Sequence, residues 1–142
     1  NLVGMADIKK SQRKIHTTFI SSFFYYIKKN IIFNNRDIYK DFLTVKKFSD
    51  IIKKFIILDA TGLYNVSLGK RVYLNDIVKW LNFHNRKKNK IVFNKLSKKF
   101  NNDSFFLNNK KLIKKLKIKT QTQELKNYCI NLSKNFFLRK NI

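Results

Sequence analysis

Lysine and arginine are the side chains of this sequence with the clearest chemistry. The chain of 142 residues holds 32 of them against eight Asp and Glu, a formal net charge of +24. Like charges repel one another across a compact fold, so an excess of this size indicates a polyanionic partner. Nucleic acid is the commonest such partner, because lysines that contact phosphates release condensed counterions. The composition therefore predicts that the chain binds RNA.

The basic residues gather in an N-terminal arm, in the middle of the chain and in a C-terminal stripe. We expect them to contact mainly the phosphate backbone, which positions a protein without reading base sequence. Tyr25, Tyr26 and Trp80 either stack on unpaired bases or pack in a core or an interface. The residues predicted to bind RNA are Lys9, Lys10, Arg13, Lys14, Lys46, Lys47, Lys54, Lys70, Arg71, Lys79, Arg86, Lys87, Lys88, Lys90, Lys110, Lys111, Lys114 and Lys115.

No arrangement of side chains in the sequence indicates catalysis. The acids are scattered, and the three glycines are isolated, so no Gly-rich phosphate loop is present. His16 and His84 lie among polar or basic residues, where solvent or phosphate contact is the expected role. Cys129 is the single cysteine and falls on an apolar helix face, as a small core residue would. We therefore predict that the protein is not an enzyme and uses no metal, cofactor or small-molecule substrate.

Helices are the elements expected to position the basic residues. Apolar residues at spacings of three and four predict one helix that includes Phe19, Phe23 and Phe24. A second helix is expected after Asp41, whose side chain can cap it. Its apolar face is Val45, Phe48, Ile51, Ile52 and Phe55.

Three further helices follow from the same periodicity. Ser67 is a plausible cap before a face made of Leu74, Ile77, Val78 and Leu81, and Ser104 before a face made of Leu107, Leu112, Ile113 and Leu116. Thr120 or Thr122 can cap a last helix, whose face is Leu125, Tyr128, Cys129, Leu132 and Phe136. Residues 91–103 are ambiguous between strand and coil. The predicted fold class is mainly α: a small helical domain with basic N- and C-terminal extensions.

One stretch of the chain carries a family resemblance. Its motif residues are Tyr39-Lys40-Asp41, Lys46, Phe48, Lys54 and Thr61-Gly62-Leu63. This spacing resembles the eighteenth protein of the bacterial-type small ribosomal subunit, and the similarity extends over residues 39–83. The chain departs from that family before Thr61-Gly62, where the family has a proline and arginines.

The resemblance implies a helical domain that binds ribosomal RNA and pairs with the sixth small-subunit protein. It divides the chain into a basic arm and amphipathic helix over residues 1–36, a helical RNA-binding core over residues 37–83 and a basic helical extension over residues 84–142. Together with the charge, it predicts a structural constituent of an organellar ribosome, in the small subunit, with neighbouring ribosomal proteins as partners.

The location follows from a coding argument. Lys, Asn, Ile and Phe have AT-rich codons and dominate the sequence, which suggests an organellar gene and a mitochondrial protein, with a plastid as the alternative. No apolar run reaches the roughly 20 residues that a membrane span needs. The competing function is a basic accessory subunit of an organellar membrane complex, with an aromatic helix at the membrane interface. A nucleic-acid enzyme is a third hypothesis, which would need clustered acids or a metal site.

Overall fold

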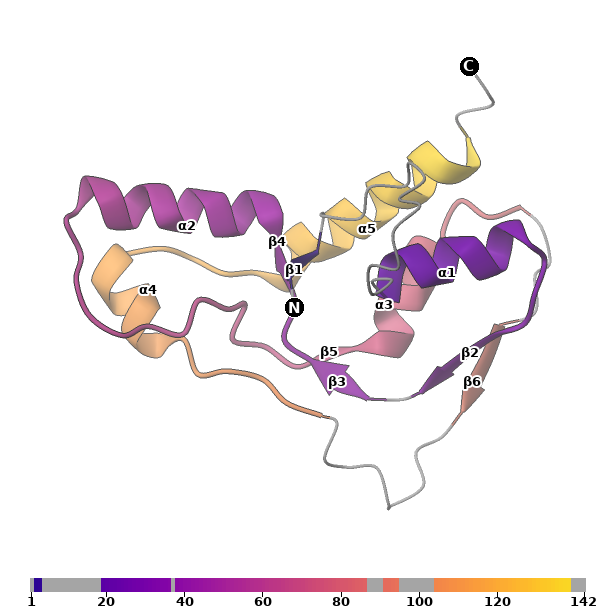
Figure 1. Ribbon diagram of the computed structural model, residues 1–142, viewed down its shortest axis with the longest axis horizontal. Helices are drawn as coiled ribbons and strands as arrows, with labels where there is room; N and C mark the ends of the chain where they lie inside the picture. Colours follow the sequence, from indigo (N-terminus) through magenta and orange to yellow (C-terminus); the bar gives the residue numbers. More distant parts are fainter. Residues whose placement is uncertain (1, 4–18, 37, 87–90, 95–103, 139–142) are drawn as a thin grey trace, which may run out of the picture.

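The computed structural model describes residues 2–3, 19–36, 38–86, 91–94 and 104–138 (Figure 1). Within these residues the protein is mainly α, as predicted, with five helices and six short strands. The helices are α1 (Phe19–Lys28), α2 (Val45–Ile57), α3 (Leu74–Leu81), α4 (Lys110–Leu116) and α5 (Thr122–Phe137). The strands are β1 (Leu2–Val3), β2 (Phe33–Arg36), β3 (Tyr39–Lys40), β4 (Leu43–Thr44), β5 (Val72–Tyr73) and β6 (Ile91–Asn94).

The strands form three separate two-stranded pairs, which join distant parts of the sequence. β1 runs parallel to β4, and β2 runs parallel to β6 with Phe33 opposite Ile91. β3 and β5 are antiparallel, with Tyr39 opposite Tyr73. The ambiguous stretch after residue 90 thus begins with a strand, β6. Pairs this short cannot stand alone, so the helices packed around them must supply their stability.

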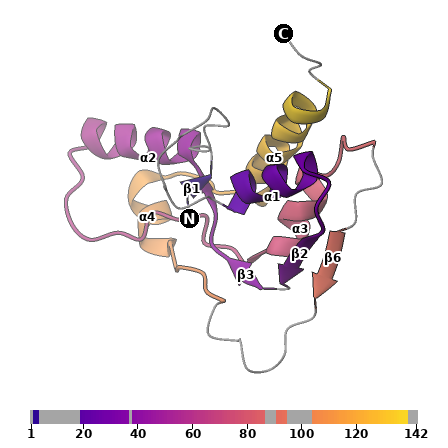
Figure 2. The same ribbon diagram turned by 45° about the vertical axis from the view of Figure 1, so that its right-hand side comes forward.

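The larger hydrophobic core lies where α1, α3 and α5 meet. All four predicted face residues of α3 are buried, and Leu125 and Cys129 of α5 pack against them. Phe24 of α1 stacks on Phe136 of α5, with ring centroids 4.3 Å apart. The views in Figures 1 and 2 show these three helices at one end of the molecule, above the β2–β6 pair. The periodicity of these helices therefore predicted their buried faces.

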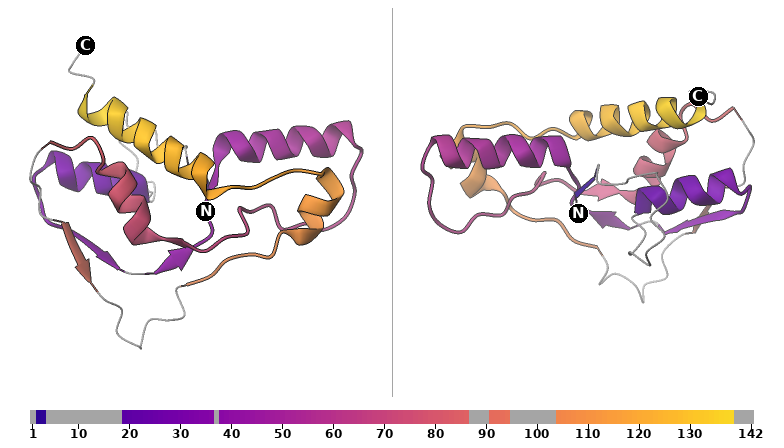
Figure 3. Two further views of the ribbon diagram at one scale, coloured as in Figure 1. Left: turned by 180° about the vertical axis from the view of Figure 1, so that it is seen from behind. Right: turned by 45° about the horizontal axis from the view of Figure 1, so that its top comes forward.

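A smaller core holds α2 and α4 together at the other end of the molecule (Figure 3). Ile51 is the one fully buried residue of α2, and it packs with Leu112 and Leu116 of α4. Phe48 and Phe55 are partly buried against this cluster, whereas Ile52 is exposed. The two cores draw on residues from all three ranges into which the sequence was divided, and the division itself stays a prediction.

Several predicted helix caps were wrong. Asp41 does not cap α2; Thr44 does, and its hydroxyl accepts a hydrogen bond from the backbone N–H of Lys47 at 3.2 Å. Ser67 is buried in a turn well before α3, whose N-cap is Tyr73. Ser104 precedes an extended segment, and α4 begins only at Lys110. Gln121 occupies the N-cap of α5, without a side-chain hydrogen bond.

Candidate functional site

Asp41 is a buried residue that connects three segments of the chain through hydrogen bonds. Its carboxylate is 3% exposed and accepts hydrogen bonds from the backbone N–H groups of Leu68 at 2.9 Å and Gly69 at 3.1 Å. It also accepts one from the backbone N–H of Leu107, at 3.2 Å. A buried carboxylate is stable only when it is hydrogen-bonded, and here backbone donors from two distant segments satisfy it. Asp41 therefore fixes two loops beside β3.

Three short segments lie side by side around this anchor. The backbone N–H of Leu74 donates to the carbonyl of Ile38 at 2.9 Å, which extends the β3–β5 pairing. On the other side, the backbone N–H of Phe105 donates to the carbonyl of Tyr39 at 3.2 Å, and the N–H of Tyr39 donates to the Ser104 hydroxyl at 3.4 Å. The backbone of residues 38–41 thus has a neighbouring segment on each side.

These segments display a group of rings and cations, which we call the aromatic–cation cluster. The guanidinium carbon of Arg71 lies 5.1 Å from the centre of the Tyr39 ring and 5.2 Å from that of Phe106. The Lys40 Nζ lies 5.4 Å from the centre of the Phe105 ring. The cluster consists of Tyr39, Lys40, Arg71, Tyr73, Phe105 and Phe106.

The cluster has the chemistry needed to hold a nucleoside diphosphate. Phe105 and Phe106 are 44% and 41% exposed, so part of each ring is accessible to a base. The Arg71 guanidinium lies beside two rings, and its planar fork of N–H donors suits bidentate phosphate binding. Neither Arg71 nor Lys40 forms an ion pair with an acid in the part of the chain that the structure describes. Both charges are therefore available to an anion.

The structure disperses the residues that were predicted to bind RNA. Seven of them lie outside the described residues: Lys9, Lys10, Arg13, Lys14, Lys87, Lys88 and Lys90. Arg71 lies in the aromatic–cation cluster, with Lys70 beside it in sequence. Lys79 approaches Asp76 at 3.8 Å, and Arg86 is exposed after α3. The α4 residues are exposed: Lys110, Lys111, Lys114 and Lys115.

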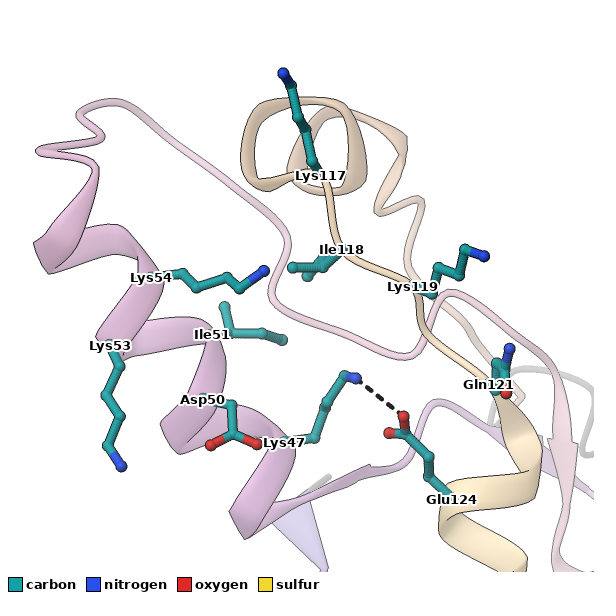
Figure 4. A pocket seen from close by; sticks show the side chains of 10 residues that line it. All are labelled: Lys47, Asp50, Ile51, Lys53, Lys54, Lys117, Ile118, Lys119, Gln121 and Glu124. Atoms are coloured by element: carbon teal, nitrogen blue, oxygen red, sulfur yellow. Dashed lines mark hydrogen bonds and ion pairs between the residues drawn. The ribbon is translucent and has the colours of Figure 1, made fainter.

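The α2 lysines form a separate group on another surface. Lys46 is exposed near the start of the helix, whereas Lys47 and Lys54 line a pocket between α2 and the segment that leads into α5 (Figure 4). Lys47 is paired there with Glu124, at 3.0 Å. RNA binding by any of these side chains stays a prediction.

Two of the proposed stacking residues, Tyr25 and Trp80, and the histidine His84 lie on or just after helices α1 and α3. Tyr25 is 57% exposed on α1, and Trp80 packs partly buried against the larger core. His84 is partly buried, and its ring lies edge-on to Phe83 with centroids 5.0 Å apart. Among the described residues, no group of three His, Cys, Asp or Glu side chains could hold a metal ion.

Cys129 lies in the larger core, as predicted. Its side chain is fully buried, and burial raises the pKa of its thiol from 9.0 to about 12. Burial, followed by the neighbouring Cys129, also raises the pKa of Tyr128. A thiolate is the reactive form of cysteine, so this environment suppresses nucleophilic chemistry at the sulfur.

Sequence reasoning missed most of the aromatic–cation cluster. Arg71 was named as a phosphate contact, but Lys40, Tyr73, Phe105 and Phe106 were not assigned to a site. No spacing rule connects them, because the cluster forms only when residues 39–40, 71–73 and 105–106 meet. The adjacent Phe105-Phe106 pair in a polar stretch was the one available signal.

Comparison with solved structures shows that this fold occurs in enzymes. The chain is similar to UDP-N-acetylglucosamine 4-epimerase from Methanobrevibacter ruminantium M1, solved with UDP-N-acetylmuramic acid, with a TM-score of 0.72 and 15% identity over 99% of this chain. It is also similar to RMD from Pseudomonas aeruginosa, solved with NADPH, with a TM-score of 0.65 and 15% identity over 89% of this chain. The chain spans 44% of the length of each. No protein-family model and no curated protein matches the sequence.

These similarities contradict the function predicted from composition. The neighbours are an epimerase and RMD with NADPH, not ribosomal proteins, so a structural constituent of an organellar ribosome and a non-enzymatic role were both wrong. The same finding replaces the alternative, a basic accessory subunit of a membrane complex. The net charge led to the wrong functional class, because it is a sum over the whole chain and does not identify a ligand. In the described residues, no helix is both long and apolar enough to cross a membrane.

Proposed function

We propose that this chain forms the part of a nucleotide-sugar enzyme that holds the nucleoside diphosphate of the substrate. The observation that carries the proposal is Arg71, whose guanidinium lies beside the Tyr39 and Phe106 rings at 5.1 and 5.2 Å with no acid of the described residues paired to it. A planar guanidinium placed in this way is suited to the oxygens of a diphosphate. Lys40 adds a second positive charge from the adjacent strand.

The fold supports this assignment. One neighbour is an epimerase solved with a UDP-linked sugar, and its fold extends over 99% of this chain. A UDP sugar has a base that can stack on aromatic rings and two phosphates that attract cations, and the cluster offers partners for each. The activity of the whole enzyme, epimerisation or reduction at the sugar, belongs to the proposal, because the chain spans 44% of these structures.

A nucleotide sugar fits the cluster better than a dinucleotide such as NADPH. Dinucleotide sites hold the pyrophosphate at a Gly-rich turn that opens a helix, with the motif G-x-G-x-x-G. The three glycines of this sequence are isolated and form no such motif. The role assigned to this chain is therefore substrate binding, through side-chain cations and rings.

Other expectations from the sequence stay predictions. The mitochondrial location rests on codon composition, which the fold does not address. The resemblance to the ribosomal family over residues 39–83 has no support from a family model. The finer architecture, a helical domain with basic terminal extensions, also remains a proposal.

The test is a ligand series measured by isothermal titration calorimetry on the full chain. UDP-N-acetylglucosamine and UDP should bind more tightly than UMP, and uridine should bind weakest, because each phosphate removed takes away an acceptor for Arg71 and Lys40. Loss of a hydrogen bond between charged groups costs about 1.5–3 kcal/mol, so Arg71→Gln should weaken UDP binding about tenfold or more. Lys114→Gln is the matched control, since it removes one exposed charge from α4. Equal affinities across the series, or equal effects of the two variants, would refute the proposal.

A further inference from the structure

A second candidate site shares no residue with the aromatic–cation cluster. It is a pocket of about 550 Å³ between α2 and the segment that links α4 to α5. Ile51 and Ile118 form its apolar floor and are 1% and 9% exposed. The volume lies within the range of roughly 300–1,000 Å³ that is usual for small-molecule sites.

The rim of this pocket is strongly basic. Five lysines line it, against the two carboxylates of Asp50 and Glu124. Figure 4 shows Lys47 and Lys54 reaching from α2 into the space, while Lys53, Lys117 and Lys119 point away from it. Lys47 is neutralised by Glu124, but no acid in the described part of the chain is paired with Lys54 or Lys119. The pocket therefore concentrates positive charge above an apolar floor.

Local structure explains why these residues converge. Lys47, Ile51 and Lys54 are spaced by four and three residues, so they share one face of α2. Across the gap, Lys117 ends α4 in the left-handed conformation, with φ of 45°. Ile118 follows it into the smaller core, and Lys119 stands beside it at the rim. The site is thus made by two separate elements.

We propose that this pocket binds a small molecule with a diphosphate group or two neighbouring phosphates. Lys54 would contact the anion from α2, and Lys119 would contact it after its exposed side chain turns inward from the opposite rim. Ile51 and Ile118 would contact the apolar part of the ligand. Compact ammonium groups on flexible stems act as point charges for phosphate, without the fixed fork of arginine. Glu124 competes with the anion for Lys47, so removal of its charge should strengthen binding.

The first test is calorimetry with inorganic pyrophosphate at constant ionic strength. It uses the full chain carrying Arg71→Gln and Lys40→Gln, so that binding at the aromatic–cation cluster is already weakened. Adding Lys54→Gln and Lys119→Gln should lower pyrophosphate affinity at least tenfold. The control adds Lys114→Gln and Lys115→Gln instead, which remove two exposed lysines from α4 and should change affinity less than twofold. Equal losses in the two proteins, or no saturable binding in the background protein, would overturn the proposal.

The second test uses Glu124. Glu124→Gln frees Lys47 and should raise pyrophosphate affinity severalfold, whereas Asp59→Asn, the matched removal of an exposed acid, should not. An unchanged or lower affinity in Glu124→Gln would contradict the role given to Lys47. Because these variants leave Arg71 and Lys40 unaltered when made in the wild-type chain, UDP binding at the cluster can be followed in the same proteins by the amide shifts of Arg71 and Phe106, separately from UDP bound in the pocket. One proposal can then fail while the other holds.

Discussion

The carboxylate of Asp41 accepts a hydrogen bond from the backbone N–H of Leu107 at 3.2 Å, across 66 positions of the sequence. The same carboxylate binds the N–H groups of Leu68 and Gly69. One buried side chain therefore helps to hold residues 104–107 against β3, on the side opposite β5. Phe105 and Phe106 reach the aromatic–cation cluster because of this connection.

Asp41→Ala should destabilise the protein strongly. Hydrogen bonds to a charged group contribute about 1.5–3 kcal/mol, and three backbone N–H groups, one buried and two partly buried, would lose their acceptor. We expect the free energy of unfolding, measured by urea denaturation, to fall by about 3 kcal/mol or more. Asp59→Asn should change it by less than about 0.5 kcal/mol, since Asp59 is exposed. A small loss in Asp41→Ala would show that Asp41 does not anchor the two loops.

Gly69→Ala should cost more than Gly62→Ala. Both glycines have positive φ, +70° at Gly69 and +114° at Gly62, so each alanine pays roughly 1–2 kcal/mol of backbone strain. At Gly69 the new methyl group also overlaps the side-chain amide of Asn109, whereas at Gly62 the nearest atom is 3.6 Å away, in Tyr64.

A double-mutant cycle isolates that overlap. In an Asn109→Ala background, Gly69→Ala should cost only the backbone strain, although Asn109→Ala itself loses the hydrogen bond that its Nδ2 donates to the Ser67 carbonyl at 2.9 Å. Urea denaturation of the four proteins gives the coupling. Additive losses would mean that Gly69 and Asn109 are not packed together as described.

Cys129 should be unreactive in the folded protein. Its thiol is fully buried and its pKa is about 12, so a disulfide reagent at pH 8 should modify it slowly until urea unfolds the chain. The folded pKa lies above the ordinary value of 9.0, so the unfolded chain loses this proton first as pH rises. Stability should therefore fall between about pH 9 and pH 12, by up to about 1.4 kcal/mol per pH unit from this group. The free energy of unfolding of Cys129→Ala should fall less steeply over the same pH range. An identical slope would show that the buried thiol does not cause the loss of stability.

The difference between arginine and lysine tests how the cluster recognises phosphate. Arg71→Lys keeps the charge but loses the planar fork beside Tyr39 and Phe106. We expect UDP affinity to fall about as far as in Arg71→Gln, roughly tenfold, if bidentate contact is what matters. Lys40→Arg is the reciprocal control and should bind UDP at least as tightly as the wild type. Full affinity in Arg71→Lys would show that charge alone suffices.

Helical periodicity predicted the helices whose faces are buried by many neighbours. The apolar face of α3 is buried as expected, because this face must pack against the core to be removed from water. It consists of Leu74, Ile77, Val78 and Leu81. The helix starts were less predictable. Asp41 has the side chain of a cap, but amides 27 to 66 positions away compete for it and hold it. The sequence around Asp41 contains no pattern that predicts hydrogen-bond partners so far away in the chain.

The candidate site was beyond sequence reasoning for the same reason. Tyr39, Arg71 and Phe106 become neighbours only through the two-residue pairing of β3 with β5 and the bond from Phe105 to Tyr39. Strands of two residues are too short to show the alternation of apolar and polar residues that identifies a strand in a sequence. The charge excess is real, but it identifies neither a fold nor a ligand, and here it favoured the wrong class of protein.

Nucleotide-sugar binding at the aromatic–cation cluster is tested most directly by a titration of the ¹⁵N-labelled chain with UDP-N-acetylglucosamine, followed by amide chemical shifts. We expect saturable shifts concentrated at Tyr39, Lys40, Arg71, Tyr73, Phe105 and Phe106, which disappear in Arg71→Gln. Two results would contradict a nucleotide-sugar site at the aromatic–cation cluster. One is a set of shifts spread over lysines on every face, and the other is no shift at a large excess of ligand.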